Sequence, residues 1–263
     1  MVDTQRFLAD VGMQGLPFPM RVVSRVDSKG QPTVANISIN ARIMQNFEAR
    51  WIDRFIQIVH RHRDSIGTET LRTNIADYLD ELKANMVRID FAYPFFIEQL
   101  TPKSKEKCLV QYLCSYSAKA SSLSSEAKVL FKIEVPCITT YPGSAPEEPG
   151  GLFGQLSTVV IEVESQHDVY PEDLVAIVDE YALSPVYSFL TEEDQRFLIQ
   201  KIHTQQKNSV VMTDEIKTKL ARMKNIDWYA VRCNNYGMLH SYSTVISTEK
   251  SSWIPFSGYE EEI

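Results

Sequence analysis

The chain has 263 residues, of which 44% are hydrophobic and 23% charged, with a formal net charge of −7. This length can bury a substantial core in one large domain or two smaller modules. The acidic balance argues against nucleic acid or an anionic membrane as the main partner, and no run of about 18 apolar residues predicts a membrane span. The cysteines show no C-x-x-C spacing and no secretory signal precedes them, so we expect reduced thiols and a cytoplasmic protein.

The first half of the chain predicts strands on either side of a helical segment. Residues 1–19 are expected to be an irregular entry segment. Apolar residues at three- and four-residue spacing predict a helix over 44–63, and Thr68 or Thr70 is a candidate cap for a second helix. The predicted strands of this half cover residues 20–25, 33–40, 87–99, 108–117 and 127–135.

The second half predicts three helices followed by two strands. Pro171 fits the first turn of a helix, Thr191 to Asp194 resembles a capping box, and Thr213 is a candidate cap for a third helix. The predicted strands of this half cover residues 158–164, 228–232 and 241–247. The order of elements indicates a pair of α+β modules with antiparallel sheets.

Between the halves lies a segment rich in proline and glycine, Val135–Ser157. It contains four prolines and four glycines, so it cannot stay regular for long and must form a loop between two strands. Such a loop often holds a binding or catalytic site, and it is as often a plain linker.

This loop resembles the signature of GTP cyclohydrolase IB, V-P-V-T-S-L-C-P-C-S-K-E followed by G-A-H-N-Q-R-S. Seven residues match without a gap: Val135, Pro136, Pro142, Ser144, Gly151, Gln155 and Ser157. Weaker matches are Tyr93–Gln99 to F-P-Y-F-I-E-K, Arg54 to a helix that begins K-G-x-H-M-S-R-F, and Asn234–Tyr242 to the terminal E-N-F-E-S-I-H-N-H, where His240 is kept.

The resemblance implies a fold and an assembly. It implies an α+β tunnelling fold (T-fold), with two modules of antiparallel sheet, helices on one face, and subunits that assemble into a barrel-type oligomer, expected to be a homo-tetramer. We place the first module at 1–135, the second at 136–247 and an acidic tail at 248–263. The expected partner is a small-molecule heterocycle, without nucleic acid or membrane.

The family uses a divalent metal that activates water to attack C8 of guanine. Its two loop cysteines fall on Tyr141 and Gly143, its loop histidine falls on Phe153, and both glutamates and the second histidine of its terminal motif are replaced. These side chains cannot hold zinc. The sequence therefore suggests a divergent homologue of GTP cyclohydrolase IB whose metal ligands are largely replaced, with no metal cofactor.

Candidate site residues follow from the same alignment. The catalytic candidates are His240, Tyr141, Gln155 and Cys233. The substrate-binding candidates are Arg54, Glu98, Ser144, Phe153, Asn234 and Tyr242. Three of them have plainer interpretations: Glu98 as a surface carboxylate, Arg54 as a solvated or ion-paired cation, and Cys233 as a buried structural thiol.

Three functions remain open. The favoured one is an enzyme on this scaffold with metal-independent chemistry on a purine, pterin or similar ring, in a specialised biosynthetic pathway. The second is a non-catalytic binding or scaffolding relative. The third is an active GTP cyclohydrolase that converts GTP to dihydroneopterin triphosphate through a rebuilt metal site, for example from His203, His240 and Cys233.

Overall fold

The computed structural model describes residues 9–43, 50–123 and 126–250, which form an α+β fold. The helices are α1 Arg50–His62, α2 Thr68–Leu82, α3 Pro171–Tyr181, α4 Glu192–Thr204 and α5 Ser209–Ala221. The strands are β1 Ala9–Val22, β2 Gln31–Ile43, β3 Ala84–Leu100, β4 Lys107–Ser121, β5 Lys128–Thr140, β6 Gly154–Glu164, β7 Ser184–Pro185, β8 Trp228–Tyr236 and β9 Ser243–Glu249. None of the helices in the described ranges is both long enough and apolar enough to span a bilayer.

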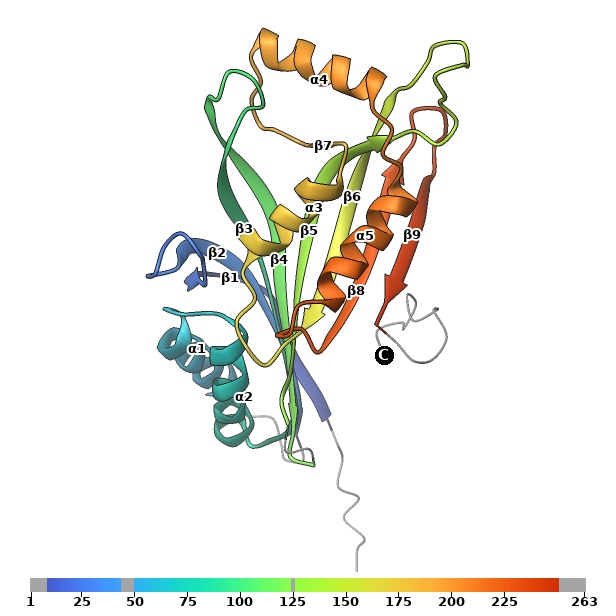
Figure 1. Cartoon of the computed structure of the whole chain (residues 1–263). Helices are drawn as coiled ribbons and strands as arrows, with labels where there is room; N and C mark the ends of the chain where they lie inside the picture. The colour runs from blue at the N-terminus through green and yellow to red at the C-terminus, as the bar shows by residue number, and fades with distance from the viewer. Residues whose placement is uncertain (1–8, 44–49, 124–125, 251–263) are drawn as a thin grey trace, which may run out of the picture. The chain divides into compact units, whose positions relative to one another are not determined.

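The strands follow the hydrogen-bonded order β1-β2-β3-β4-β5-β6-β8-β9, with β7 beside β5 (Figure 1). The chain groups into two compact units made of non-contiguous segments. The first unit comprises residues 1–95, 114–131 and 164–170, and the second comprises 96–113, 132–163 and 171–263. The boundary between sequence modules at residues 135 and 136 stays a prediction, and most of the expected tail lies outside the described residues.

In the first unit, the expectation of an irregular entry segment is wrong from Ala9 onward. Strand β1 pairs antiparallel with β2 over almost its whole length, with one irregularity between Met13 and Leu16. Pro17 and Pro19 lie in this strand, and within the described residues β1 pairs along its length with β2 and otherwise forms only an isolated bridge at its end, from Val22 to Ile66. Proline is tolerated on an edge strand because its missing N–H would face away from the sheet.

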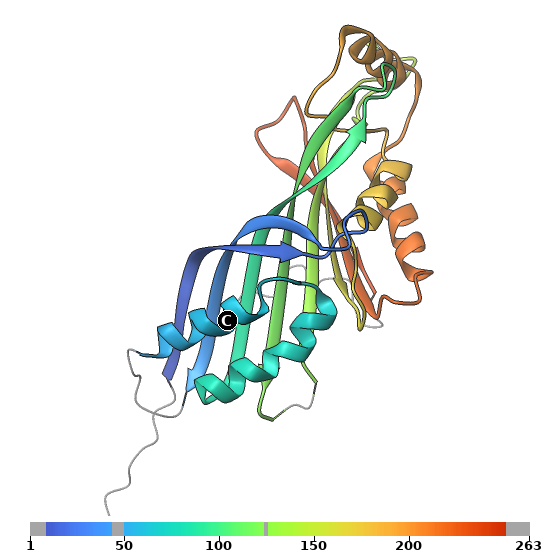
Figure 2. The same ribbon diagram turned by 90° about the vertical axis from the view of Figure 1, so that its left-hand side faces the viewer.

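The helices of the first unit bury an aromatic face. Helix α1 stacks Trp51 on Phe55, with ring centroids 6.3 Å apart, and Phe55 contacts Tyr78 of α2 at 6.1 Å. Both helices lie against one face of the strands of this unit (Figure 2). The three- and four-residue spacing therefore predicted the helix correctly from Arg50 on, and the predicted start over 44–49 lies outside the described residues.

In the second unit, helices α3 and α5 lie over one face of the strands (Figure 1). Buried apolar side chains of both helices form the core on that side. The other face of β3 and β4 exposes four apolar side chains, Phe96, Leu100, Leu109 and Leu113.

The helix starts test three predicted caps. The predicted cap at Thr68 or Thr70 is wrong, because Gly67 is the N-cap of α2 and Thr70 lies in the first turn, where its hydroxyl accepts from the Gly67 N–H. The predicted capping box is confirmed, because Thr191 Oγ1 accepts a hydrogen bond from the Asp194 N–H and the Asp194 side chain accepts one from the Thr191 N–H. The predicted cap at Thr213 is wrong, because α5 begins at Ser209 and is capped by Asn208. Thr213 lies inside the helix, where its hydroxyl donates to the Ser209 carbonyl at 2.7 Å.

The strands around the central loop extend further than predicted. Strand β5 continues to Thr140 and β6 begins at Gly154, so residues 141–153 form the connection. Strand β8 continues to Tyr236, because β9 pairs with it from Ala230 to Tyr236. This continued pairing positions the residues of the candidate site.

Candidate functional site

The loop between β5 and β6 is closed by its own backbone. The Tyr141 N–H donates to the Phe153 carbonyl at 2.9 Å, so the two ends of the loop meet. Their rings stack with centroids 4.9 Å apart and an interplanar angle of 17°. Ser144 folds back, since its N–H and its hydroxyl both donate to the Tyr141 carbonyl. The Tyr141 ring is therefore held in place by the stacked Phe153 ring and by the hydrogen bonds that close the loop.

Beside this ring lies a cavity of about 210 Å³ that the loop shares with the turn between β8 and β9. All of its lining residues belong to the second unit: Tyr141, Pro142, Gly143, Gln155, Asn235, Gly237, His240, Tyr242 and Thr244. His240 stacks on Tyr242, with centroids 4.8 Å apart and an interplanar angle of 11°. The structure thus brings together four of the candidate residues, Tyr141, Gln155, His240 and Tyr242. Their roles stay predictions.

A buried polar network joins the strands beside the cavity. Gln155 Nε2 donates to Thr139 Oγ1 at 3.3 Å, and Thr139 Oγ1 lies 2.8 Å from Ser157 Oγ. Ser157 Oγ donates to Asn235 Oδ1 at 2.8 Å. These four side chains are at most 4% exposed. Buried polar groups need such partners, so the network fixes the two amides that reach the cavity.

Asn235 rather than Asn234 lines the cavity. The side chains of β8 alternate, so that Tyr229, Val231, Cys233 and Asn235 are buried and Asn234 is on the other face. The alignment with the family motif did not distinguish the two asparagines. The alternation of β8, had the strand been predicted beyond residue 232, would have assigned Asn235 to the buried face.

Cys233 is fully buried and does not line the cavity. Burial raises the pKa of its thiol to about 12, and its Sγ donates to Asn235 Oδ1 at 3.5 Å. Because the thiolate is the nucleophilic form, this environment favours a structural thiol. The predicted catalytic role of Cys233 is untested, and its burial and raised pKa weigh against it.

The remaining candidates lie away from the cavity lining. Ser144 is buried within the loop, and Phe153 stacks on the face of Tyr141. Glu98 is exposed on β3 and pairs with Lys107 at 2.8 Å, as in the plainer interpretation of a surface carboxylate. Arg54 is exposed on α1 of the first unit.

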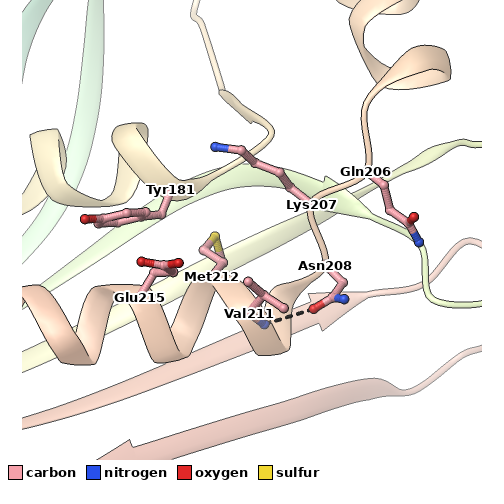
Figure 3. Close-up of a pocket in the computed structure, with 7 residues that line it drawn as sticks. All are labelled: Tyr181, Gln206, Lys207, Asn208, Val211, Met212 and Glu215. Carbon is pink, nitrogen blue, oxygen red and sulfur yellow. Dashed lines mark hydrogen bonds between the residues drawn. The ribbon is translucent and has the colours of Figure 1, made fainter.

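A second cavity, of about 340 Å³, lies where α3 ends and α5 begins (Figure 3). Its lining residues are Tyr181, Gln206, Lys207, Asn208, Val211, Met212 and Glu215. In Figure 3, Asn208 Oδ1 accepts from the Val211 N–H, which is the cap of α5. Lys207 Nζ donates to the Glu180 carbonyl. None of the candidate site residues lines this cavity.

The residues described do not fit the divalent metal that the family resemblance implies. Across residues 9–43, 50–123 and 126–250, no three His, Cys, Asp or Glu side chains are grouped to share an ion, so His203, His240 and Cys233 do not form a rebuilt site. Asp194, in the first turn of α4, is buried, and its oxygens accept hydrogen bonds from Lys103, Ser104 and Thr191. We therefore derive no step through a metal.

The fold and this cavity define a T-fold protein with a small pocket beside its sheet. Two solved structures have the same fold: the uricase from Arthrobacter globiformis, with a TM-score of 0.52 and 9% sequence identity, covering 98% of this chain and 96% of that one, and the urate oxidase from Bacillus sp. TB-90, with a TM-score of 0.57 and 8% identity, covering 92% and 99%. At such identities the likeness shows the fold alone.

The sequence comparisons give the family. The family model described as "Type I GTP cyclohydrolase folE2" matches residues 2–245. Proteins named "GTP cyclohydrolase FolE2" are similar over nearly the whole chain: 28% identical in Geobacter sp. (strain M21), covering 95% of this chain and 92% of the relative, and 30% in Geotalea uraniireducens (strain Rf4), covering 94% and 90%. The chain belongs to the type I GTP cyclohydrolase FolE2 family.

This membership corrects the interpretation drawn from the signature motifs. A divergent homologue with a degraded site was inferred from replacements at a few motif positions. The family match extends over residues 2–245 and includes every one of those motifs. That interpretation is therefore wrong, and the family to which the chain belongs is one of enzymes.

Proposed function

We propose that the protein is a GTP cyclohydrolase that opens the purine ring of GTP and yields dihydroneopterin triphosphate. One observation supports this beyond the family match. The central loop carries the motif resemblance with the most matching residues, the turn between β8 and β9 carries the weaker one that keeps His240, and both segments line the same cavity. Segments about 100 residues apart in sequence thus meet at one site.

The side chains of the cavity suit a flat heterocycle. The rings of Tyr141, His240 and Tyr242 offer aromatic faces for stacking. The imidazole of His240 can accept and donate a proton at the ring nitrogens or at water beside them, and it is the only histidine in the cavity lining. Pro142 and Gly143 complete the lining of the cavity.

The size of the cavity points to a site that holds the ring and not the whole nucleotide. Pockets for complete ligands measure roughly 300–1,000 Å³, and this one measures about 210 Å³. Its lining residues include no lysine or arginine, so the triphosphate would be held elsewhere. A homo-oligomer, expected to be a tetramer in the cytoplasm, would supply further residues. The exposed apolar side chains Phe96, Leu100, Leu109 and Leu113 support such an assembly.

Turnover of GTP tests the proposal. The purified protein is incubated with GTP alone and with added zinc, manganese or iron, while formate and dihydropterin are measured. We expect both products. His240→Ala should lower kcat by about 10²-fold or more, in keeping with loss of an acid–base group, and His60→Ala, at an exposed histidine on α1, should leave kcat unchanged.

Two further results would decide between the alternatives. Absence of both products with every metal would overturn the proposal and favour the non-catalytic binding relative. Elemental analysis of the purified protein tests the expectation that it has no metal cofactor, because a stoichiometric metal would contradict that expectation while leaving the reaction unaffected.

A further inference from the structure

The cavity described above contains two buried amides, Gln155 and Asn235, which are 4% and 2% exposed. They come from different strands, β6 and β8, and are joined by the hydroxyls of Thr139 and Ser157. Each hydroxyl has a single proton to donate. A hydroxyl that donates to one neighbour must accept from the other, so the donation of Ser157 to Asn235 fixes the directions of the two bonds that follow it.

The thiol of Cys233 indicates that direction. Its pKa of about 12 keeps it protonated, so it acts as a donor to Asn235 Oδ1. Ser157 donates to the same oxygen, which leaves Ser157 to accept from Thr139. Thr139 then accepts from Gln155 Nε2. All four bonds are consistent with one arrangement of protons.

This arrangement leaves one hydrogen-bond acceptor and one hydrogen-bond donor available to a ligand. The Gln155 Oε1 oxygen remains as an acceptor, and the Asn235 amide keeps N–H donors, one of which has only a long contact of 3.5 Å to Thr244 Oγ1. Reversing these hydrogen bonds would exchange the two amides and would still leave one donor and one acceptor. With either direction of the hydrogen bonds, the network therefore offers a ligand one donor and one acceptor.

We infer that Gln155 and Asn235 recognise the lactam edge of a heterocycle, a ring C=O next to a ring N–H. The carbonyl accepts from Asn235 and the N–H donates to Gln155, while the aromatic rings of the cavity stack on the face of the ligand. The inference rests on the proposed function, since it assigns ring recognition at the same site. Neither amide can rotate without breaking the buried network, so a ring without the lactam leaves a buried polar group unpaired.

The first test compares two nucleosides that share the sugar and the ring system and differ at one ring edge. Inosine has the lactam edge, and purine riboside has the same ring system without the C=O and the N–H. Isothermal titration of each into the wild-type protein should give at least about tenfold tighter binding of inosine, because an unpaired buried group opposes the poorer ligand. Equal affinities, or tighter binding of purine riboside, would overturn the inference.

Variants of the network sharpen the test. Asn235→Asp replaces the donor by an acceptor and should reduce the preference for inosine to less than about threefold. Ser157→Ala removes the bond that orients Asn235 and should reduce the preference by a smaller factor. Asn36→Asp, the same change at an exposed asparagine of β2, is the control and should keep the wild-type preference. An unchanged preference in Asn235→Asp would contradict the inference.

Turnover of GTP, measured on the same preparations, separates this inference from the proposed function. Turnover together with equal binding of the two nucleosides would overturn the recognition by Gln155 and Asn235 and leave the reaction standing. A strong preference for inosine that depends on Asn235, without turnover, would uphold the recognition and overturn the reaction. If the protein neither turns over GTP nor prefers inosine, both the proposed reaction and the proposed recognition are overturned.

Discussion

Two carboxylates of the second unit, the buried Asp194 and the half-buried Asp179, have pKa values that are shifted in opposite directions. Burial raises the pKa of each. At Asp194, hydrogen bonds from Ser104, Thr191 and Lys103 outweigh this effect and hold the pKa well below its usual range. At Asp179, on α3, the hydrogen bond from Gln99 does not outweigh the effect of burial, and the pKa rises to about 6.

The difference lies in the number of donors that each site supplies. Asp194 accepts from two backbone N–H groups of the β3–β4 loop, from the backbone of Thr191 and from two hydroxyls. Asp179 Oδ1 is buried and, in the portion of the chain that the structure describes, has no hydrogen-bond partner. A charged carboxylate is stable inside a protein when local donors replace its hydration, and otherwise it favours its protonated form.

The largest effect is expected from Asp194→Ala. It leaves the donors of the loop and of α4 without an acceptor, so the melting temperature should fall by roughly 5–10 °C. Asp214→Ala removes an exposed carboxylate from α5 and should shift it by no more than about 1 °C. Calorimetry of both variants measures this difference, and equal melting temperatures would show that the network around Asp194 adds little stability.

The second effect is a change in the free energy of unfolding with pH, caused by the titration of Asp179. Its pKa in the folded state, about 6, lies above that of an unfolded aspartate, so the folded state binds more protons between these values. The free energy of unfolding should therefore fall by roughly 2–3 kcal/mol as the pH rises from about 4 through 6. Urea unfolding at several pH values measures this change.

The matched variant for this measurement is Asp179→Asn. It keeps the shape of the side chain and removes its titration, so the difference between wild type and variant isolates one group. We expect the variant to be the more stable protein above pH 6 and the difference to shrink toward pH 4. A difference that does not change with pH would contradict the raised pKa.

The smallest effect concerns an uncharged acceptor at a helix start. Asn208 Oδ1 accepts from the Val211 N–H at the start of α5, so Asn208→Ala should reduce the free energy of unfolding by about 1 kcal/mol. Thr213→Val, inside the same helix, should change it by less than about 0.5 kcal/mol, since only a hydroxyl bond to a helix carbonyl is lost. The opposite ranking in urea unfolding would show that the hydrogen bond of the Asn208 cap contributes little stability.

Local sequence patterns predicted much of the fold. The spacing of Trp51 and Phe55 predicted α1, and the Thr191 to Asp194 pattern predicted the start of α4, because both depend on residues within one or two turns of a helix. The entry strand β1 was missed. Its prolines suggest irregular structure locally, and only its pairing with β2 makes it a strand.

The candidate site was predictable in part. The motif resemblance selected Tyr141, Gln155, His240 and Tyr242, which line one cavity. It did not select Asn235, because the choice between neighbouring asparagines depends on how far β8 extends and on its register with β9. It also inferred a degraded site from single motif positions, whereas family membership is carried by similarity spread along residues 2–245.

The sequence alone therefore determined the helices, most strand positions and the segments that form the site, since these follow from local periodicity, capping and motif spacing. The tertiary structure decided which side chains meet and in what protonation state. Those outcomes depend on strand pairing over long sequence separations and on the number of donors that distant segments bring to a buried group. Asp194 and Asp179 are both acidic residues on or beside helices, and only their surroundings distinguish them.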